Sequence, residues 1–97
     1  MPEVLQRRYG HAGRPSLSRA KSAARGAFDL DKFRGATDRA AHGRAQEAAA
    51  KVLGTFDGTH ELAEYAEAYH RARTVEGLSS AAAECAALAV YEAALRG

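Results

Sequence analysis

Residues 79–95 read SSAAAECAALAVYEAAL, and this stretch decides the fold. Alanine is the strongest helix former, so its density here predicts a helix that Ser79 or Ser80 would cap. Between Ala81 and Leu95 the only charged side chains are Glu84 and Glu92. A helix that is apolar on nearly all sides needs cover on nearly all sides. The sequence therefore raises the question of what covers this helix.

One face of this helix is the predicted contact surface. At about 100° per residue, a single broad stripe gathers Leu78 with the larger side chains that follow it. Glu84 and Glu92 lie inside or beside that stripe, and two interpretations of them stay open. They either edge the stripe and reach water, or they meet arginines of another helix or subunit. We expect self-association through Ala81, Glu84, Cys85, Leu88, Tyr91, Glu92 and Leu95.

Length and composition indicate one small domain with a thin core. The chain has 97 residues and is 46% hydrophobic, but alanine makes up much of that fraction. Association with itself or with another protein would bury alanine faces that a lone bundle leaves wet. A single cysteine excludes an intrachain disulfide and favours a cytoplasmic location. No run of about 18 apolar residues occurs, so no membrane span is predicted.

The N-terminal stretch, residues 1–28, is predicted to be a flexible basic arm. Glycines and a proline interrupt it early, at Gly10, Gly13 and Pro15. Its second part, residues 18–27, has the composition of a segment that becomes helical when bound. One acidic residue, Glu3, stands against six basic residues, which we expect to contact a partner or a nucleic acid: Arg7, Arg8, Arg14, Arg19, Lys21 and Arg25.

Three interpretations of this arm remain open. It contacts the phosphates of DNA or RNA, which needs basic side chains but no sequence choice. It is an organelle transit peptide, although Gly10, Gly13 and Pro15 disrupt the amphipathic helix of such peptides. Or it is a solvated tail. The charge division fits the first, since residues 1–51 carry eleven basic and five acidic side chains and residues 52–97 carry three and seven.

The body, residues 29–97, is predicted to be all-α. Helices are expected at about 30–53, 60–75 and 79–96, and Gly54 stands where a left-handed residue ends the first of them. The link of residues 54–58 is short, which makes the helices it joins antiparallel neighbours. The sequence thus predicts a small antiparallel three-helix bundle preceded by the basic arm.

No catalytic chemistry is indicated. Cys85 has no histidine, lysine or arginine within a turn, so it resembles an inert small hydrophobe. The sequence contains no glycine-rich nucleotide motif and no zinc-ligand spacing. We therefore expect no enzyme, no cofactor and no metal site. The four histidines are expected on the arm or on polar helix faces: His11, His42, His60 and His70.

A metal site between chains is kept as a minor alternative. Glu67 and His70 have the Glu-x-x-His spacing with which ferritin-like bundles hold iron, and Glu47 lies at a similar height on the preceding helix. Ligands in such bundles project inward, whereas helical phase turns these three side chains outward. The sequence favours a non-enzymatic protein-binding and assembly module, with a sequence-independent, coat-like or nucleoid-like nucleic-acid-binding protein as the alternative.

Overall fold

Four α-helices make up the part of the chain that the computed structural model describes, residues 14–97. The expected all-α class is confirmed, and no strand occurs within these residues. The expected three-helix bundle is wrong, because the body contains one helix more. The helices are α2 (Arg14–Phe33), α3 (Asp38–Leu53), α4 (Thr59–Thr74) and α5 (Ser80–Arg96).

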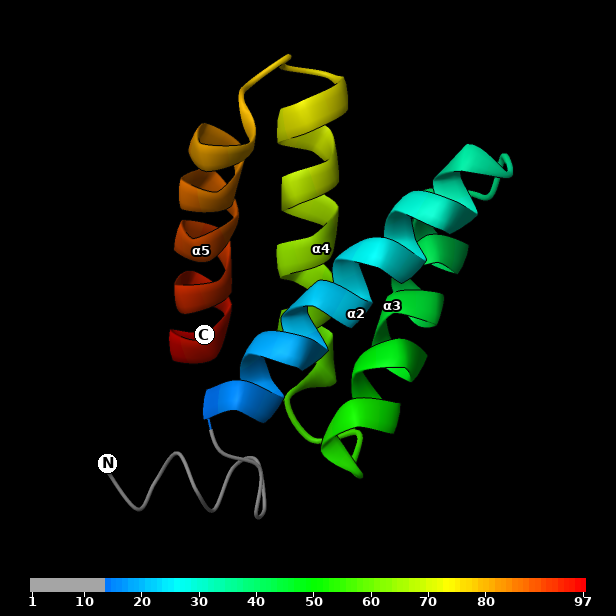
Figure 1. Ribbon diagram of the computed structural model, residues 1–97, viewed down its shortest axis with the longest axis vertical. Coiled ribbons are helices and arrows are strands. Elements are labelled where there is room, and N and C mark those ends of the chain that lie inside the picture. Colours follow the sequence, from blue (N-terminus) through cyan, green and yellow to red (C-terminus); the bar gives the residue numbers. More distant parts are fainter. Residues whose placement is uncertain (1–13) are drawn as a thin grey trace.

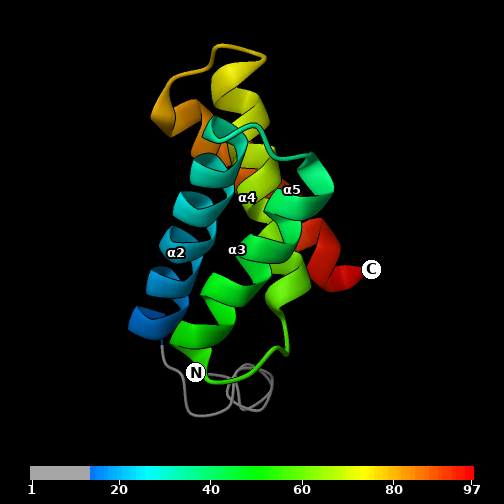
Figure 2. The ribbon, with the colours of Figure 1, turned by 90° about the vertical axis from the view of Figure 1, so that its right-hand side faces the viewer.

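Helix α4 is the centre of the arrangement (Figure 1). It packs against α2, α3 and α5, whereas α5 packs against α4 alone among the described helices. The helices α2 and α3 form one hairpin, and α4 and α5 form a second. In Figure 2 the first hairpin lies in front of the second. Helix α5 therefore lies at the edge of the fold, with close backbone packing against α4 alone.

The helix expected at 30–53 is in fact two helices. Gly35 adopts a left-handed conformation, with φ of 90°, two residues after α2 ends. Thr37 is extended, and its side chain accepts a hydrogen bond from the backbone N–H of Ala40 at 3.1 Å, which starts α3. A left-handed glycine followed by a threonine cap ends one helix and begins the next. The chain folds back here, so α2 lies against α3 instead of continuing it.

Residues 14–28, expected to belong to the flexible arm, form most of α2 in the structure. Ala20, Ala24 and Phe28 follow one another at four-residue steps, and all three are fully buried. Side chains at this spacing share one face of a helix, so α2 is a core element of the body. The remainder of the expected arm, residues 1–13, lies outside the described part of the chain.

Two helix ends were predicted correctly. Gly54 is left-handed, with φ of 77°, and its N–H donates to the carbonyl of Ala50 at 2.7 Å. Ser79 caps α5 by accepting from the backbone N–H of Ala82 at 3.2 Å. Both ends follow from local hydrogen bonding, which sequence alone specifies.

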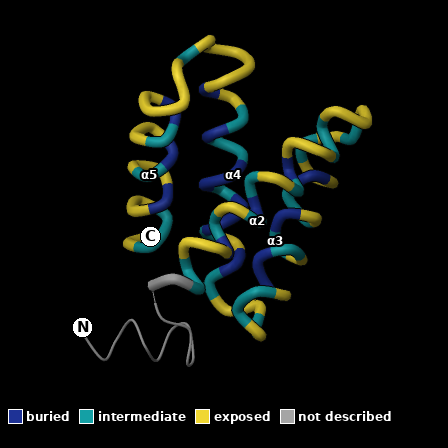
Figure 3. The backbone as a smooth tube through the Cα atoms, viewed as in Figure 1, coloured by how far each residue is buried: buried dark blue, intermediate teal, exposed yellow. Residues whose placement is uncertain are grey.

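The core is built largely of alanine (Figure 3). Alanine fills the buried faces of α2 and α3 almost alone, which lets these helices approach one another closely. No helix in residues 14–97 has the length and hydropathy needed to span a membrane. The larger buried hydrophobic side chains are few, and most of them belong to α4: Phe28, Leu62, Tyr65, Tyr69 and Tyr91.

Candidate functional site

The outer face of α5 is an apolar helix surface that the fold leaves open. Only the edge turned toward α4 is buried, through Ala83, Ala87 and Tyr91. Figure 3 shows this buried edge along α5 and the exposed residues on its other sides. We define the α5 outer face as five exposed apolar residues in the same helix: Ala82, Ala86, Ala89, Val90 and Ala93.

The predicted self-association residues straddle the boundary between the core and this surface. Tyr91 is buried, and Leu88 and Leu95 pack against the core cluster while partly exposed. Ala81, Cys85 and Glu92 are exposed. The predicted stripe of self-association residues therefore lies at the border of the buried face of α5. The larger side chains that define this stripe follow one edge of the contact between α4 and α5.

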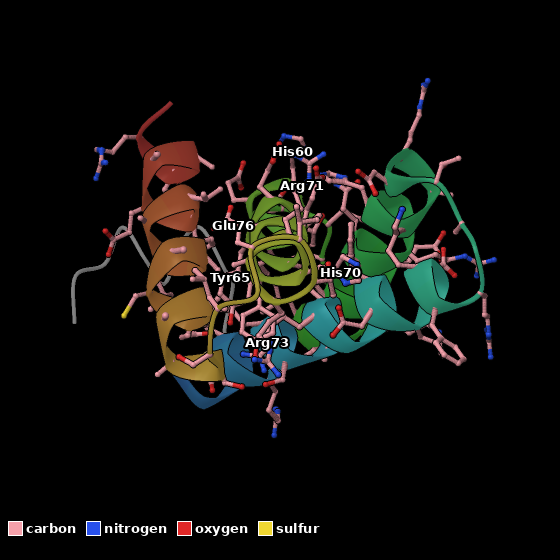
Figure 4. The ribbon with its side chains drawn as sticks, turned by 90° about the horizontal axis from the view of Figure 1, so that it is seen from above. His60, Tyr65, His70, Arg71, Arg73 and Glu76 are labelled. Atoms are coloured by element: carbon pink, nitrogen blue, oxygen red, sulfur yellow. The ribbon has the colours of Figure 1, made fainter. Side chains whose placement is uncertain are left out.

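A shallow groove runs between α4 and α5, next to the α5 outer face. Its volume is about 290 Å³. Ala86 and Val90 line it from α5, and Ala68 and Ala72 line it from α4. Charged side chains of α4 and of the residues after it form its rim, and Figure 4 shows two of them, Arg71 and Glu76. The rim residues are Glu64, Glu67, Arg71 and Glu76.

A polar network behind α5 fixes its position relative to α2 and α4. Arg25 of α2 donates to Glu84 of α5 at 3.0 Å and to the Tyr65 hydroxyl at 3.1 Å. The Tyr65 hydroxyl donates in turn to the same Glu84 oxygen at 2.6 Å. Of the two interpretations of Glu84, the structure supports pairing with an arginine of another helix. Glu92, by contrast, is exposed.

Aromatic rings complete this network. The Arg25 guanidinium lies 4.0 Å from the centre of the Tyr69 ring, within the range of a cation–π contact. The rings of Tyr65 and Tyr91 meet edge to face at 6.3 Å. Burial, and next the hydrogen bond to Glu84, raise the pKa of Tyr65 from 10.0 to about 12. The hydroxyl therefore stays protonated and able to donate to Glu84.

The six basic residues assigned to the arm have different places. Arg7 and Arg8 lie outside the described residues, and Arg14 begins α2. Arg19 is exposed, and Lys21 is half-buried with its amine 5.6 Å from the Tyr65 ring centre. Arg25 faces the interior network. The clue to this role was the four-residue spacing of Ala20, Ala24 and Phe28, beside which Lys21 and Arg25 stand.

The residues of the ferritin-like alternative do not converge. The Glu67 carboxylate lies 3.7 Å from Arg71 on its own helix. His70 Nδ1 lies 2.7 Å from the Asp29 carboxylate, and its ring packs against Phe28 with the ring centres 5.3 Å apart. Glu47 is exposed and lines a separate groove near the end of α3. Within one chain these three side chains thus form no common site.

Comparison of the chain with protein-family models, with curated proteins and with solved structures found no match.

Proposed function

We propose that this protein is a non-enzymatic assembly module that pairs with a second copy of itself through the α5 outer face. The observation that supports the proposal is the position of α5 at the edge of the fold. Its backbone packs closely against α4 alone, Arg25 of α2 reaches it through the ion pair with Glu84, and its outer side presents alanines and Val90 to solvent. Apolar helix faces of this kind are stabilised when a second helix covers them.

Small side chains on this face favour contact between two helices. Ala82, Ala86, Ala89 and Ala93 follow three- and four-residue steps, so they lie on one side of α5. Without bulky side chains between them, two helix backbones approach closely. A face that pairs with its own copy produces a twofold symmetric dimer, in which each contact occurs twice.

The expected affinity is low. Burying four alanine methyl groups at about 0.8 kcal/mol each and Val90 at about 1.5 kcal/mol contributes roughly 5 kcal/mol per chain. Two chains therefore contribute roughly 10 kcal/mol, against an association cost of about 4 kcal/mol or more. A dissociation constant between about 1 µM and 1 mM is consistent with such a balance. The module would respond to local concentration.

Sedimentation over a concentration series tests the proposal. In reducing buffer, which prevents disulfides through Cys85, the apparent mass should rise above the 10.3 kDa of one chain as concentration increases. Ala89→Glu places like charges across the symmetric contact and should return the protein to one chain. Ala40→Glu is the matched control, because Ala40 is also an exposed helical alanine but lies on α3.

Two results would contradict this function. One is a mass of a single chain for the parent protein up to about 1 mM, the weak limit given above. The other is equal loss of association in Ala89→Glu and Ala40→Glu, which would place the contact away from the α5 outer face. Circular dichroism of both variants checks that the fold is kept.

A second candidate function is sequence-independent binding of DNA or RNA. Exposed arginines gather on the α2–α3 hairpin and on the turn that joins its helices, while the groove between α4 and α5 has a mainly acidic rim. Exposed basic side chains on this hairpin favour contact with a phosphate backbone. The exposed arginines of this side are Arg19, Arg34, Arg39 and Arg44.

A gel-shift titration tests this second function. Binding should appear at low salt and weaken steeply as salt rises, because each neutralised phosphate releases counterions. Arg39→Gln with Arg44→Gln should weaken binding, whereas Arg96→Gln, an exposed arginine at the end of α5, should not. Absence of binding at low salt would exclude the nucleic-acid function and leave the assembly function untouched.

A further inference from the structure

Three potential metal ligands meet on the side of α4 that faces away from α2. His60 and Glu64 are one turn apart on α4, and His42 reaches them from α3. Figure 4 shows His60 on this side of the helix, together with Arg71. Among the described residues, these three offer ligand atoms that all lie within 4.8 Å of one another.

The spacing of these atoms is close to that of a coordination shell. His60 Nε2 lies 3.4 Å from Glu64 Oε1. Two ligands of a tetrahedral zinc ion, each about 2.1 Å from the metal, stand about 3.4 Å apart. The rings of His42 and His60 are 5.1 Å apart between centres and inclined by 54°. The His42 nitrogen lies within 4.8 Å of the other two ligand atoms, so a shared ion needs it to move closer by about 1 Å.

The backbone beneath these side chains is held in place. Gln46, one turn after His42 on α3, donates to the Thr59 hydroxyl at 3.4 Å. Thr59 is fully buried, and its hydroxyl donates to the carbonyl of Phe56 at 2.7 Å. These bonds fix how far α3 is shifted along α4 at the level of His42 and His60. Two helices with a fixed register present their ligands with little cost of ordering.

We propose that His42, His60 and Glu64 form a binding site for a divalent first-row transition ion of the Zn²⁺ class. Two imidazoles and one carboxylate suit zinc, nickel, cobalt and copper, whereas Mg²⁺ and Ca²⁺ prefer oxygen ligands. Three protein ligands leave a coordination position for water. The ion links α3 to α4 outside the buried core and therefore stabilises the packing of these two helices.

The ligands form a site at the protein surface. The side chains of His60 and Glu64 are 62% and 39% exposed, so an ion reaches them without any opening of the fold. Without the ion, the contact between His60 and Glu64 is a surface pair of low energy. None of its three residues belongs to α5, although Glu64 also forms part of the rim of the groove beside the α5 outer face.

Isothermal titration of the untagged full chain with Zn²⁺ at neutral pH, in a Cys85→Ser background, tests the proposal. We expect one ion per chain and at least a tenfold loss of affinity in His42→Ala, His60→Ala and Glu64→Gln, since each variant removes one ligand. Glu67→Gln is the matched control, because Glu67 is a carboxylate of the same helix outside the cluster. Mg²⁺ should not bind detectably.

A thermal melt gives a second readout. At a free Zn²⁺ concentration about 100 times the dissociation constant, the melting temperature should rise by about 10 °C or more. At the same Zn²⁺ concentration this rise should fall to about half or less in His60→Ala, whose exposed side chain can be removed without disturbing the core. The proposal is overturned if Zn²⁺ binds the parent chain no more tightly than it binds His60→Ala. Equal loss in Glu67→Gln would overturn it as well.

Discussion

Replacing Phe28 by alanine tests whether α2 belongs to the core. Phe28 is fully buried, and its ring packs against His70 of α4. Removing a buried phenyl ring costs about 3–5 kcal/mol, from the lost transfer free energy and from the cavity left behind. A domain of this size has a total unfolding free energy of about 5–15 kcal/mol. Phe28→Ala should therefore remove a large part of the stability of the fold.

Phe33→Ala is the matched control, because Phe33 lies on the same helix and is 89% exposed. The unfolding free energy of the Phe33→Ala variant should stay within about 0.5 kcal/mol of the parent value. For Phe28→Ala the melting temperature should fall by about 12–40 °C, from a loss of about 3–5 kcal/mol at about 4–8 °C per kcal/mol for a domain of this size. Urea unfolding followed by circular dichroism measures both variants.

This experiment distinguishes a flexible arm that reaches to residue 28 from a helix α2 that packs in the core. If residues up to 28 were a solvated arm, as the sequence suggested, Phe28→Ala and Phe33→Ala would have equal and negligible effects. A loss of less than about 1 kcal/mol in Phe28→Ala would fall outside the range for a buried ring and would refute the packing of α2. A large loss confined to Phe28→Ala supports four helices in one cooperative core.

The polar network and the glycines give three further predictions. Tyr65→Phe removes a hydroxyl bonded to both Arg25 and Glu84, so urea unfolding should show a loss of about 1.5–3 kcal/mol, and an unchanged midpoint would contradict the network. In a spectroscopic pH titration, Tyr65 should ionise near its raised pKa of about 12, and its deprotonation should be missing in Tyr65→Phe. Because the folded state holds this proton more tightly than the unfolded chain, its contribution to stability is fully present below pH 10.0 and is lost as the pH rises through about 12. Gly43 lies inside α3 with open space around it, so Gly43→Ala should stabilise the fold by about 1 kcal/mol. Gly54 is left-handed, with φ of 77°, so Gly54→Ala should destabilise the fold by about 1–2 kcal/mol. Equal effects of the two substitutions would refute the left-handed cap.

Local features of the fold followed from the sequence. The all-helical class, the helix after Ser79 and the cap at Gly54 depend on residues that are neighbours in the chain. The same reasoning failed between Arg14 and Thr37, where the positive charge of α2 obscured the spacing of its buried alanines. The break between α2 and α3 was not predicted, although Gly35 and the capping residue Thr37 both stand in the sequence.

The candidate sites depended on tertiary contacts. The sequence placed the self-association stripe along the larger side chains of α5, and α4 covers part of that stripe because it takes up the side marked by Ala83 and Ala87. Alanine is apolar on every side of a helix, so the pattern alone does not say which side meets a neighbour. His42 and His60 are eighteen positions apart in the sequence. They become neighbours because of the way α3 packs against α4.

The sequence by itself determined the all-helical class and the helix ends at Gly54 and Ser79, since both arise from hydrogen bonds among residues close together in the chain. The tertiary structure decided which alanines are core, which arginine is internal and which histidines meet. Those outcomes depend on how whole helices pack against one another, and in a chain this rich in alanine few bulky side chains specify that packing in advance.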